Sequence, residues 1–199
     1  MTLPVTTISC TPKQTQSLLQ PSEALGTILA QETASLAAAN KRVAVISPDA
    51  GWGAPSTAEE AFKRAMKQQG FDVVTAKSAN LGDPMRRGQL GLKTEDFLEA
   101  LEKSADAGAL VSFAGAPLMK AADAAQLNPK HPPVLVLATA SLGNVPGMWS
   151  DPIRLADLID ATVVELAIID TQEPGPQIGK ADATRQLFDQ HYHILRRVH

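Results

Sequence analysis

The sequence predicts an α/β protein in which a mainly parallel sheet is covered by helices on both faces. Short apolar runs without alternation, which are typical of strands buried on both sides, recur along the chain. Segments with the apolar spacing of helices separate these runs. Strands that alternate with helices form parallel sheets with right-handed crossovers, so we expect a three-layer, doubly wound architecture.

The opening unit of this fold is the stretch 42–70. Val43 to Ile46 form a continuous apolar strand, and a turn containing two glycines follows it. Ser56 or Thr57 caps the next helix, whose apolar residues recur on one side. On the opposite, polar side of this helix we expect Glu59 and Lys63 to pair.

The other elements follow from the same two patterns. We predict further helices at 22–39, 94–107, 118–125, 152–159 and 182–190, and further strands at 71–76, 109–114, 134–138, 162–170 and 191–198. The last strand would lie at an edge of the sheet. Residues 1–21 are rich in Thr, Pro, Gln and Ser and are expected to form a flexible tail or linker, so the single domain would span 22–199.

Composition excludes several functions. The formal net charge is -3, which argues against a general nucleic-acid binder. Cys10 is the only cysteine, so neither an intramolecular disulfide nor a thiolate metal cage can form. The chain has no apolar segment of about 18 residues, the length that a membrane-spanning helix needs.

The predicted strand order is the flavodoxin-like 2-1-3-4-5, in which the order reverses between the first and third strands. Ligands of open parallel sheets bind beyond the carboxyl ends of the strands near such a reversal. The loops 47–57, 114–117 and 139–149 would meet there, and they supply the candidate ligand-binding residues Asp49, Trp52, Ser56, Thr57, Gly115, Ser141, Asn144 and Trp149.

The start of the helix at Thr57 has two interpretations. Free backbone donors and the positive end of the helix dipole could bind a carboxylate or phosphate. Alternatively, Ser56 and Thr57 only cap their own helix, as most such residues do. The sequence leaves both interpretations open.

Known catalytic and cofactor motifs are not found. The stretch 51–56 matches only half of a dinucleotide-binding fingerprint, so we predict no cofactor. His191, His193 and His199 are better explained as edge or surface residues than as metal ligands, so we predict no metal site. No nucleophile with a neighbouring histidine and no paired acid and base stand out, so we assign no catalytic residue.

Roughly half of the chain resembles a known family. Its Asp-x-x-Trp-Gly turn and AEEAFKRAMKQQG helix within 43–70, with the segments 94–115 and 117–137, resemble one lobe of type 1 periplasmic binding proteins, the branched-chain amino-acid receptor group. The resemblance implies a periplasmic or secreted protein. Those receptors close two lobes over a ligand, whereas this chain is long enough for one, so only the loop Asp49–Thr57 carries over as a contact.

The expected function is therefore a non-enzymatic binding or scaffold domain. It would recognise a small polar ligand or a protein partner, including a second copy of itself, at the carboxyl ends of its strands. The alternative is an enzyme on a flavodoxin-like fold that acts on a phosphorylated or nucleotide-like compound.

Overall fold

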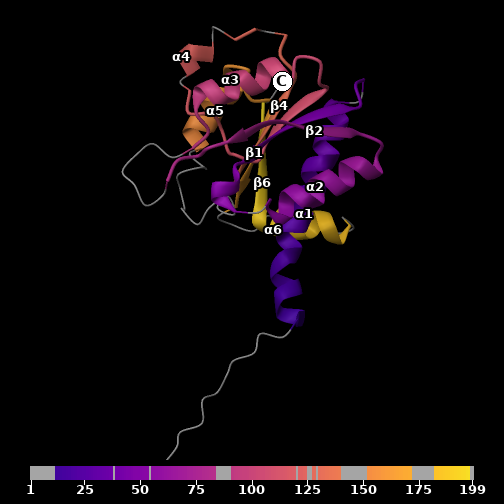
Figure 1. The fold of residues 1–199 in the computed structure, drawn as a ribbon. Coiled ribbons are helices and arrows are strands. Elements are labelled where there is room, and N and C mark those ends of the chain that lie inside the picture. The colour runs from indigo at the N-terminus through magenta and orange to yellow at the C-terminus, as the bar shows by residue number, and fades with distance from the viewer. Residues whose placement is uncertain are drawn as a thin grey trace, which may run out of the picture.

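A single mixed sheet forms the middle layer of the protein (Figure 1). The computed structural model describes residues 12–37, 39–53, 55–83, 91–119, 121–124, 127–128, 130–139, 152–171 and 182–197. Within these ranges the sheet has the strand order β2-β1-β3-β4-β5-β6. Its strands are β1 (Arg42–Pro48), β2 (Asp72–Ala79), β3 (Ala109–Ser112), β4 (Val134–Ala138), β5 (Leu166–Asp170) and β6 (Tyr192–Arg196).

The topology confirms the predicted strand order and the additional C-terminal edge strand. Strands β1 to β5 pair in parallel, and β6 runs antiparallel to β5. In β1, Val43 and Val45 point into one core and Ala44 and Ile46 into the other. Because this strand is central and buried on both faces, its apolar run has no alternation.

Helices cover both faces of the sheet and complete the three layers (Figure 1). One face packs against α1, α2 and α6, and the other against α3, α4 and α5. The helices are α1 (Pro12–Leu36), α2 (Thr57–Gln68), α3 (Thr94–Lys103), α4 (Ala121–Ala124), α5 (Pro152–Asp160) and α6 (Ala183–His191), with a short 3-10 turn, η1 (Ala50–Trp52).

Helix α1 begins earlier than predicted. We expected it to start at Ser22, because a proline inside a helix removes one backbone hydrogen bond. In the structure the helix starts at Pro12 and continues through Pro21, so a predicted tail reaching to residue 21 is too long. Figure 1 shows its first turns extending beyond the body of the domain.

The two helices α1 and α2 cross at very close range. A Cβ atom added at Gly26 of α1 would lie 2.1 Å from the carbonyl oxygen of Ala58 and 2.9 Å from the Cβ of Ala61. Only glycine fits at this crossing. The first turn of α2 is therefore positioned by backbone-to-backbone packing against α1.

Strand β2 is longer than predicted and contains a bulge. Val45 of β1 pairs with Thr75, but the next residue, Ile46, pairs with Lys77. Ala76 is the extra residue, and the shift directs Lys77 to the face of the sheet that α3 covers. Such a one-residue insertion has no clear signal in a sequence.

Other boundaries also differ from the prediction, and two of them have a clear structural reason. The strand predicted at 162–170 starts only at Leu166, because Thr162 has a φ of 59° and ends α5 with a left-handed turn. The helix predicted at 118–125 is reduced to α4, because Pro117 instead forms a bridge with Leu92.

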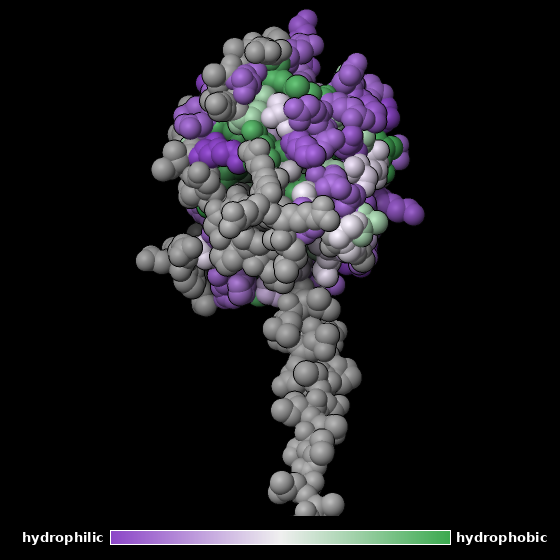
Figure 2. Space-filling view, turned by 60° about the vertical axis from the view of Figure 1, so that its left-hand side comes forward, coloured by the Kyte–Doolittle hydropathy of each residue, from purple (hydrophilic) through white to green (hydrophobic). Residues whose placement is uncertain are grey.

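None of the helices in the described ranges has the length and hydrophobicity needed to cross a membrane. On the face shown in Figure 2, hydrophobic residues appear between hydrophilic ones in the upper part of the domain. Leu36 and Leu98 are the large hydrophobic side chains most exposed among the described residues.

Candidate functional site

The candidate site lies at the carboxyl ends of β1 and β3, where the strand order reverses. The chain leaves β1 toward α2 on one face of the sheet, and it leaves β3 toward α4 on the other. Two neighbouring loops thus diverge at this point, which is the usual ligand position in doubly wound sheets.

The first loop closes on itself through Asp49. The Oδ1 atom of Asp49 accepts a hydrogen bond of 3.0 Å from the backbone N–H of Gly51, and thereby caps η1. Its own N–H donates to the carbonyl of Ala79 at 2.9 Å, which fixes the loop to the end of β2. Asp49 is therefore held at the edge of the sheet. The backbone of Trp52 lies in the same turn, but its side chain is not described.

Ser56 is the cap of helix α2. Its hydroxyl oxygen accepts a hydrogen bond of 3.2 Å from the N–H of Glu59, and Thr57 is the first helical residue. Glu59 and Glu60 place two carboxylates in the first turn, where they already complement the positive end of the helix dipole. An anion added at this helix start would meet these carboxylates. The arrangement therefore favours the capping interpretation over anion binding.

Glu59 is the residue that sequence reasoning misplaced. The pairing with Lys63 is present, with Nζ and Oε1 2.6 Å apart, but Glu59 is only 1% exposed and does not lie on a solvent-facing side. The same Oε1 accepts a hydrogen bond of 2.6 Å from the hydroxyl of Ser47, near the end of β1. Spacing offered a signal, since Glu59 precedes Phe62 and Met66 of the buried face by three and seven residues.

The carboxylate of Glu59 is bonded on one side only. Both of its donors, Ser47 and Lys63, bind Oε1. Oε2 is buried, and no described residue donates a hydrogen bond to it. An unbonded buried acceptor costs about 1–3 kcal/mol, so this arrangement needs an explanation.

The second loop, after β3, is packed inside the protein. Gly115 has a φ of 83° and is buried, and its carbonyl accepts a hydrogen bond of 2.6 Å from the hydroxyl of Ser112. The N–H of Leu118 donates to the carbonyl of Leu92 at 2.7 Å, which ties the following turn to the segment before α3. Gly115 therefore lies buried beneath the edge of the site and affects its shape through the backbone turn.

The structure thus brings together part of the predicted set. Asp49, Ser56 and Thr57 lie around the start of α2, beside Ser47 and Glu59. Of the other predicted residues, Gly115 is buried after β3, the side chain of Trp52 is not described, and Ser141, Asn144 and Trp149 lie outside the described residues.

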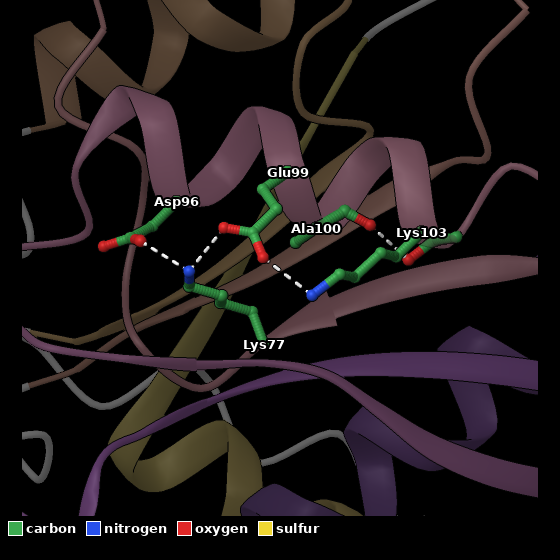
Figure 3. A network of polar contacts seen from close by, with 6 residues as sticks. Lys77, Asp96, Glu99, Ala100 and Lys103 are labelled. Atoms are coloured by element: carbon green, nitrogen blue, oxygen red, sulfur yellow. Dashed lines mark hydrogen bonds and ion pairs between the residues drawn. The ribbon is translucent and has the colours of Figure 1, made fainter.

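A second polar cluster joins β2 to α3 (Figure 3). The Nζ atom of Lys77 lies 2.9 Å from Asp96 and 2.5 Å from Oε2 of Glu99, while Oε1 of Glu99 lies 2.7 Å from Lys103. Hydrogen bonds from Lys103 and then from Lys77 lower the pKa of Glu99 to about 2, and the bond with Glu99 is the main reason that the pKa of Lys77 is raised. Each charge has a partner, so the cluster is a structural link.

Two grooves lie elsewhere on the described surface. One, of about 530 Å³, lies between α1, α2 and α6, where Glu23 and Arg64 face each other at 3.7 Å. The other, of about 330 Å³, lies beside α3 and includes Leu98 and Pro132. Neither groove includes Ser47 or Glu59. Among the described residues, no three His, Cys, Asp or Glu side chains form a potential metal cluster.

Fold and strand order together define a flavodoxin-like, doubly wound α/β domain. Comparisons with protein-family models and with curated proteins found no match to this chain. Its function must therefore be argued from the geometry of the site.

Proposed function

We propose that the protein is a non-enzymatic binding domain that recognises a small polar ligand at the carboxyl ends of β1 and β3. The observation that carries this proposal is the buried carboxylate of Glu59, whose Oε2 accepts no hydrogen bond from any described residue and which lies where the strand order reverses. Buried polar groups are nearly always bonded, and each exception needs an explanation, such as a functional role, strain, or a bound water molecule or ion.

A protein partner is the second form of this proposal. The resemblance to one lobe of type 1 periplasmic binding proteins supports a binding role and export to the periplasm or beyond. In such a receptor the ligand is enclosed by two lobes. A second copy of this chain, or another protein, would supply the missing wall over the loop from Asp49 to Thr57.

The alternative, an enzyme that binds a phosphorylated or nucleotide-like compound at the start of α2, has less support. Such a site uses the free backbone donors and the positive dipole of a helix N-terminus. Here the Ser56 hydroxyl accepts the N–H of Glu59, and the carboxylates of Glu59 and Glu60 occupy the first turn. A phosphate would be repelled by the carboxylate of Glu60, whereas that of Glu59 is already paired with Lys63.

A thermal-shift screen against amino acids, sugars, nucleotides and metal ions tests the proposed function. We expect at least one small polar compound to raise the melting temperature, because a ligand that binds only the folded state stabilises it. Trp52→Ala and Asp49→Asn should weaken that binding without unfolding the protein. Leu98→Ala, an exposed position on α3, is the control and should leave it unchanged.

Compounds that bind both loop variants as tightly as the original protein would remove this loop from the site. A screen in which no compound of any class changes the melting temperature would contradict the small-ligand function.

A further inference from the structure

The two oxygens of the Glu59 carboxylate are used unequally. Oε1 accepts two hydrogen bonds of 2.6 Å, from the Ser47 hydroxyl and the Lys63 ammonium group. Oε2 accepts none from any described residue, although it is equally buried. A carboxylate oxygen can accept two hydrogen bonds, so Oε2 has its full capacity left.

Ser47 and Lys63 also fix the orientation of the carboxylate. Ser47 belongs to a central strand, and Lys63 lies one helical turn beyond Glu59 on α2. Helix α2 is itself held by the close crossing with α1 at Gly26. Since both donors hold Oε1 from rigid elements, Oε2 is presented in one direction, as a recognition group must be.

The local charge balance indicates what kind of group Oε2 would accept. The Lys63 ammonium group at 2.6 Å already neutralises the carboxylate, and the positive end of the α2 dipole adds to this. A cationic ligand would add an uncompensated charge in a buried place, which is unfavourable. An anionic group such as a carboxylate only accepts hydrogen bonds and has no hydrogen to donate to Oε2. An uncharged hydrogen-bond donor meets neither penalty.

We propose that Oε2 of Glu59 accepts a hydrogen bond from an uncharged ligand group, such as the N–H of a carboxamide. Ser47 and Lys63 are positioning residues that hold the acceptor. This inference rests on the proposed binding function and specifies the chemistry of the ligand. Because Oε2 is shielded from solvent, the atoms that cover it must move when the ligand binds, and the bond that forms is enclosed and strong.

Three small probes of similar size and different charge test the inference. The protein is titrated at constant ionic strength with acetamide, methylammonium chloride and sodium acetate, and backbone amide shifts are followed by NMR. We expect acetamide to give saturable shifts centred on Ser47, Glu59 and Lys63. Methylammonium and acetate should give none there.

Glu59→Gln is the decisive variant, and Glu60→Gln is its matched control. Ser47 and Lys63 should keep the amide oxygen of Gln on their side, so an NH2 group replaces Oε2 and a ligand donor meets another donor. Acetamide affinity should fall roughly tenfold or more, as expected for losing a hydrogen bond to a charged group. Glu60 is exposed in the same turn, and Glu60→Gln should bind as before.

Glu59→Met keeps the length of the side chain without a carboxylate and provides a second test if Glu59→Gln does not fold. It should also lose acetamide binding. Three results would overturn the inference: unchanged acetamide binding in the folded variants, no saturable acetamide binding by the original protein, or preferential binding of methylammonium or acetate at these residues. A crystal structure in saturating acetamide with only a water molecule on Oε2 would overturn it as well.

The two proposals can fail separately. A compound from the thermal-shift screen that binds the original protein and Glu59→Gln alike would overturn the role of Glu59 and leave the binding function standing. A screen without any hit would contradict the binding function itself.

Discussion

Two clusters in this protein pair lysine with glutamate, and they differ in how completely the carboxylate is bonded. Glu99, at the surface, has a lysine on each oxygen: Lys103 at 2.7 Å and Lys77 at 2.5 Å. Glu59, which is buried, has both donors on one oxygen and none from the described residues on the other. At the surface water can fill an unused position, so only the buried cluster bears a cost for its incompleteness. This cost is the reason for our proposal that Oε2 of Glu59 binds a ligand.

The largest effect on stability is expected at the crossing of α1 and α2, which positions Glu59 but not Glu99. Gly26→Ala puts a methyl group 2.1 Å from the Ala58 carbonyl oxygen, so α1 and α2 must separate. We expect a loss of about 3 kcal/mol in the free energy of unfolding, at the upper end for an overpacked site. Thr27→Ala, the neighbouring position in α1, is the control. A urea titration gives both values, and equal stabilities would show that the crossing is not tight.

Replacing one lysine in each cluster compares the stability of the two clusters directly. Lys63→Met leaves Glu59 buried with Ser47 as its remaining donor, and we expect a loss of about 2 kcal/mol at neutral pH. Lys77→Met should cause a smaller loss, since water can solvate Asp96 and Glu99. Chemical denaturation of both variants is the measurement. If Lys77→Met were the more destabilising change, our ranking of the two clusters would be wrong.

Replacing the buried Glu59 should raise the stability of the protein, whereas replacing Lys63 lowers it. Glu59→Met removes a buried charge that is incompletely compensated, and the Lys63 side chain left behind is 36% exposed, so water can solvate it. We expect a gain of about 1 kcal/mol together with the loss of ligand binding, whereas Glu99→Met should lower stability. Differential scanning calorimetry of the two variants would settle the sign, and a destabilised Glu59→Met would argue for a structural role.

The smallest effect is a pH dependence of the surface cluster. The pKa of Glu99 is lowered from 4.5 to about 2 in the folded protein, so its contribution is complete above 4.5 and is lost as the pH falls toward 2. The pKa of Lys77 is raised above 10.5, so its contribution is lost only as the pH rises beyond that value. The difference in melting temperature between the original protein and Glu99→Gln should therefore shrink below pH 4.5. A constant difference down to pH 2 would contradict this.

Local sequence patterns were sufficient for most of the fold. The apolar runs of β1 and β4 and the periodicity of α2 reflect which residues are buried. The spacing of apolar residues in the sequence shows this burial directly. The boundaries that were wrong depend on tertiary structure. Helix α1 continues through Pro21, Thr162 adopts a left-handed conformation despite its branched side chain, and Ala76 is inserted as a bulge.

The site could be predicted only in part. The position of Asp49, Ser56 and Thr57 follows from strand order and capping patterns, which place them at the carboxyl edge, and their role as ligand-binding residues stays a prediction. Ser47 and Glu59 were missed as partners, because the burial of Glu59 depends on the angle at which α2 lies against β1. The sequence predicted Glu59 on the polar side of the helix with Lys63 as its partner, and the structure shows its carboxylate buried and bonded to Ser47 as well as to Lys63.

The antiparallel course of β6 determines how the chain can be handled in experiments. Arg196 pairs with Leu166 at the beginning of β5, so the last strand ends at the side of the sheet opposite Glu59. Helix α1 runs in the same direction as β6, since Ala37, the residue after its last turn, lies near Gly108 just before β3, but its first turns project past the opposite, carboxyl ends of the strands (Figure 1). A dye or surface linker attached after β6 would leave the proposed recognition edge accessible, whereas one attached before α1 would stand beside it.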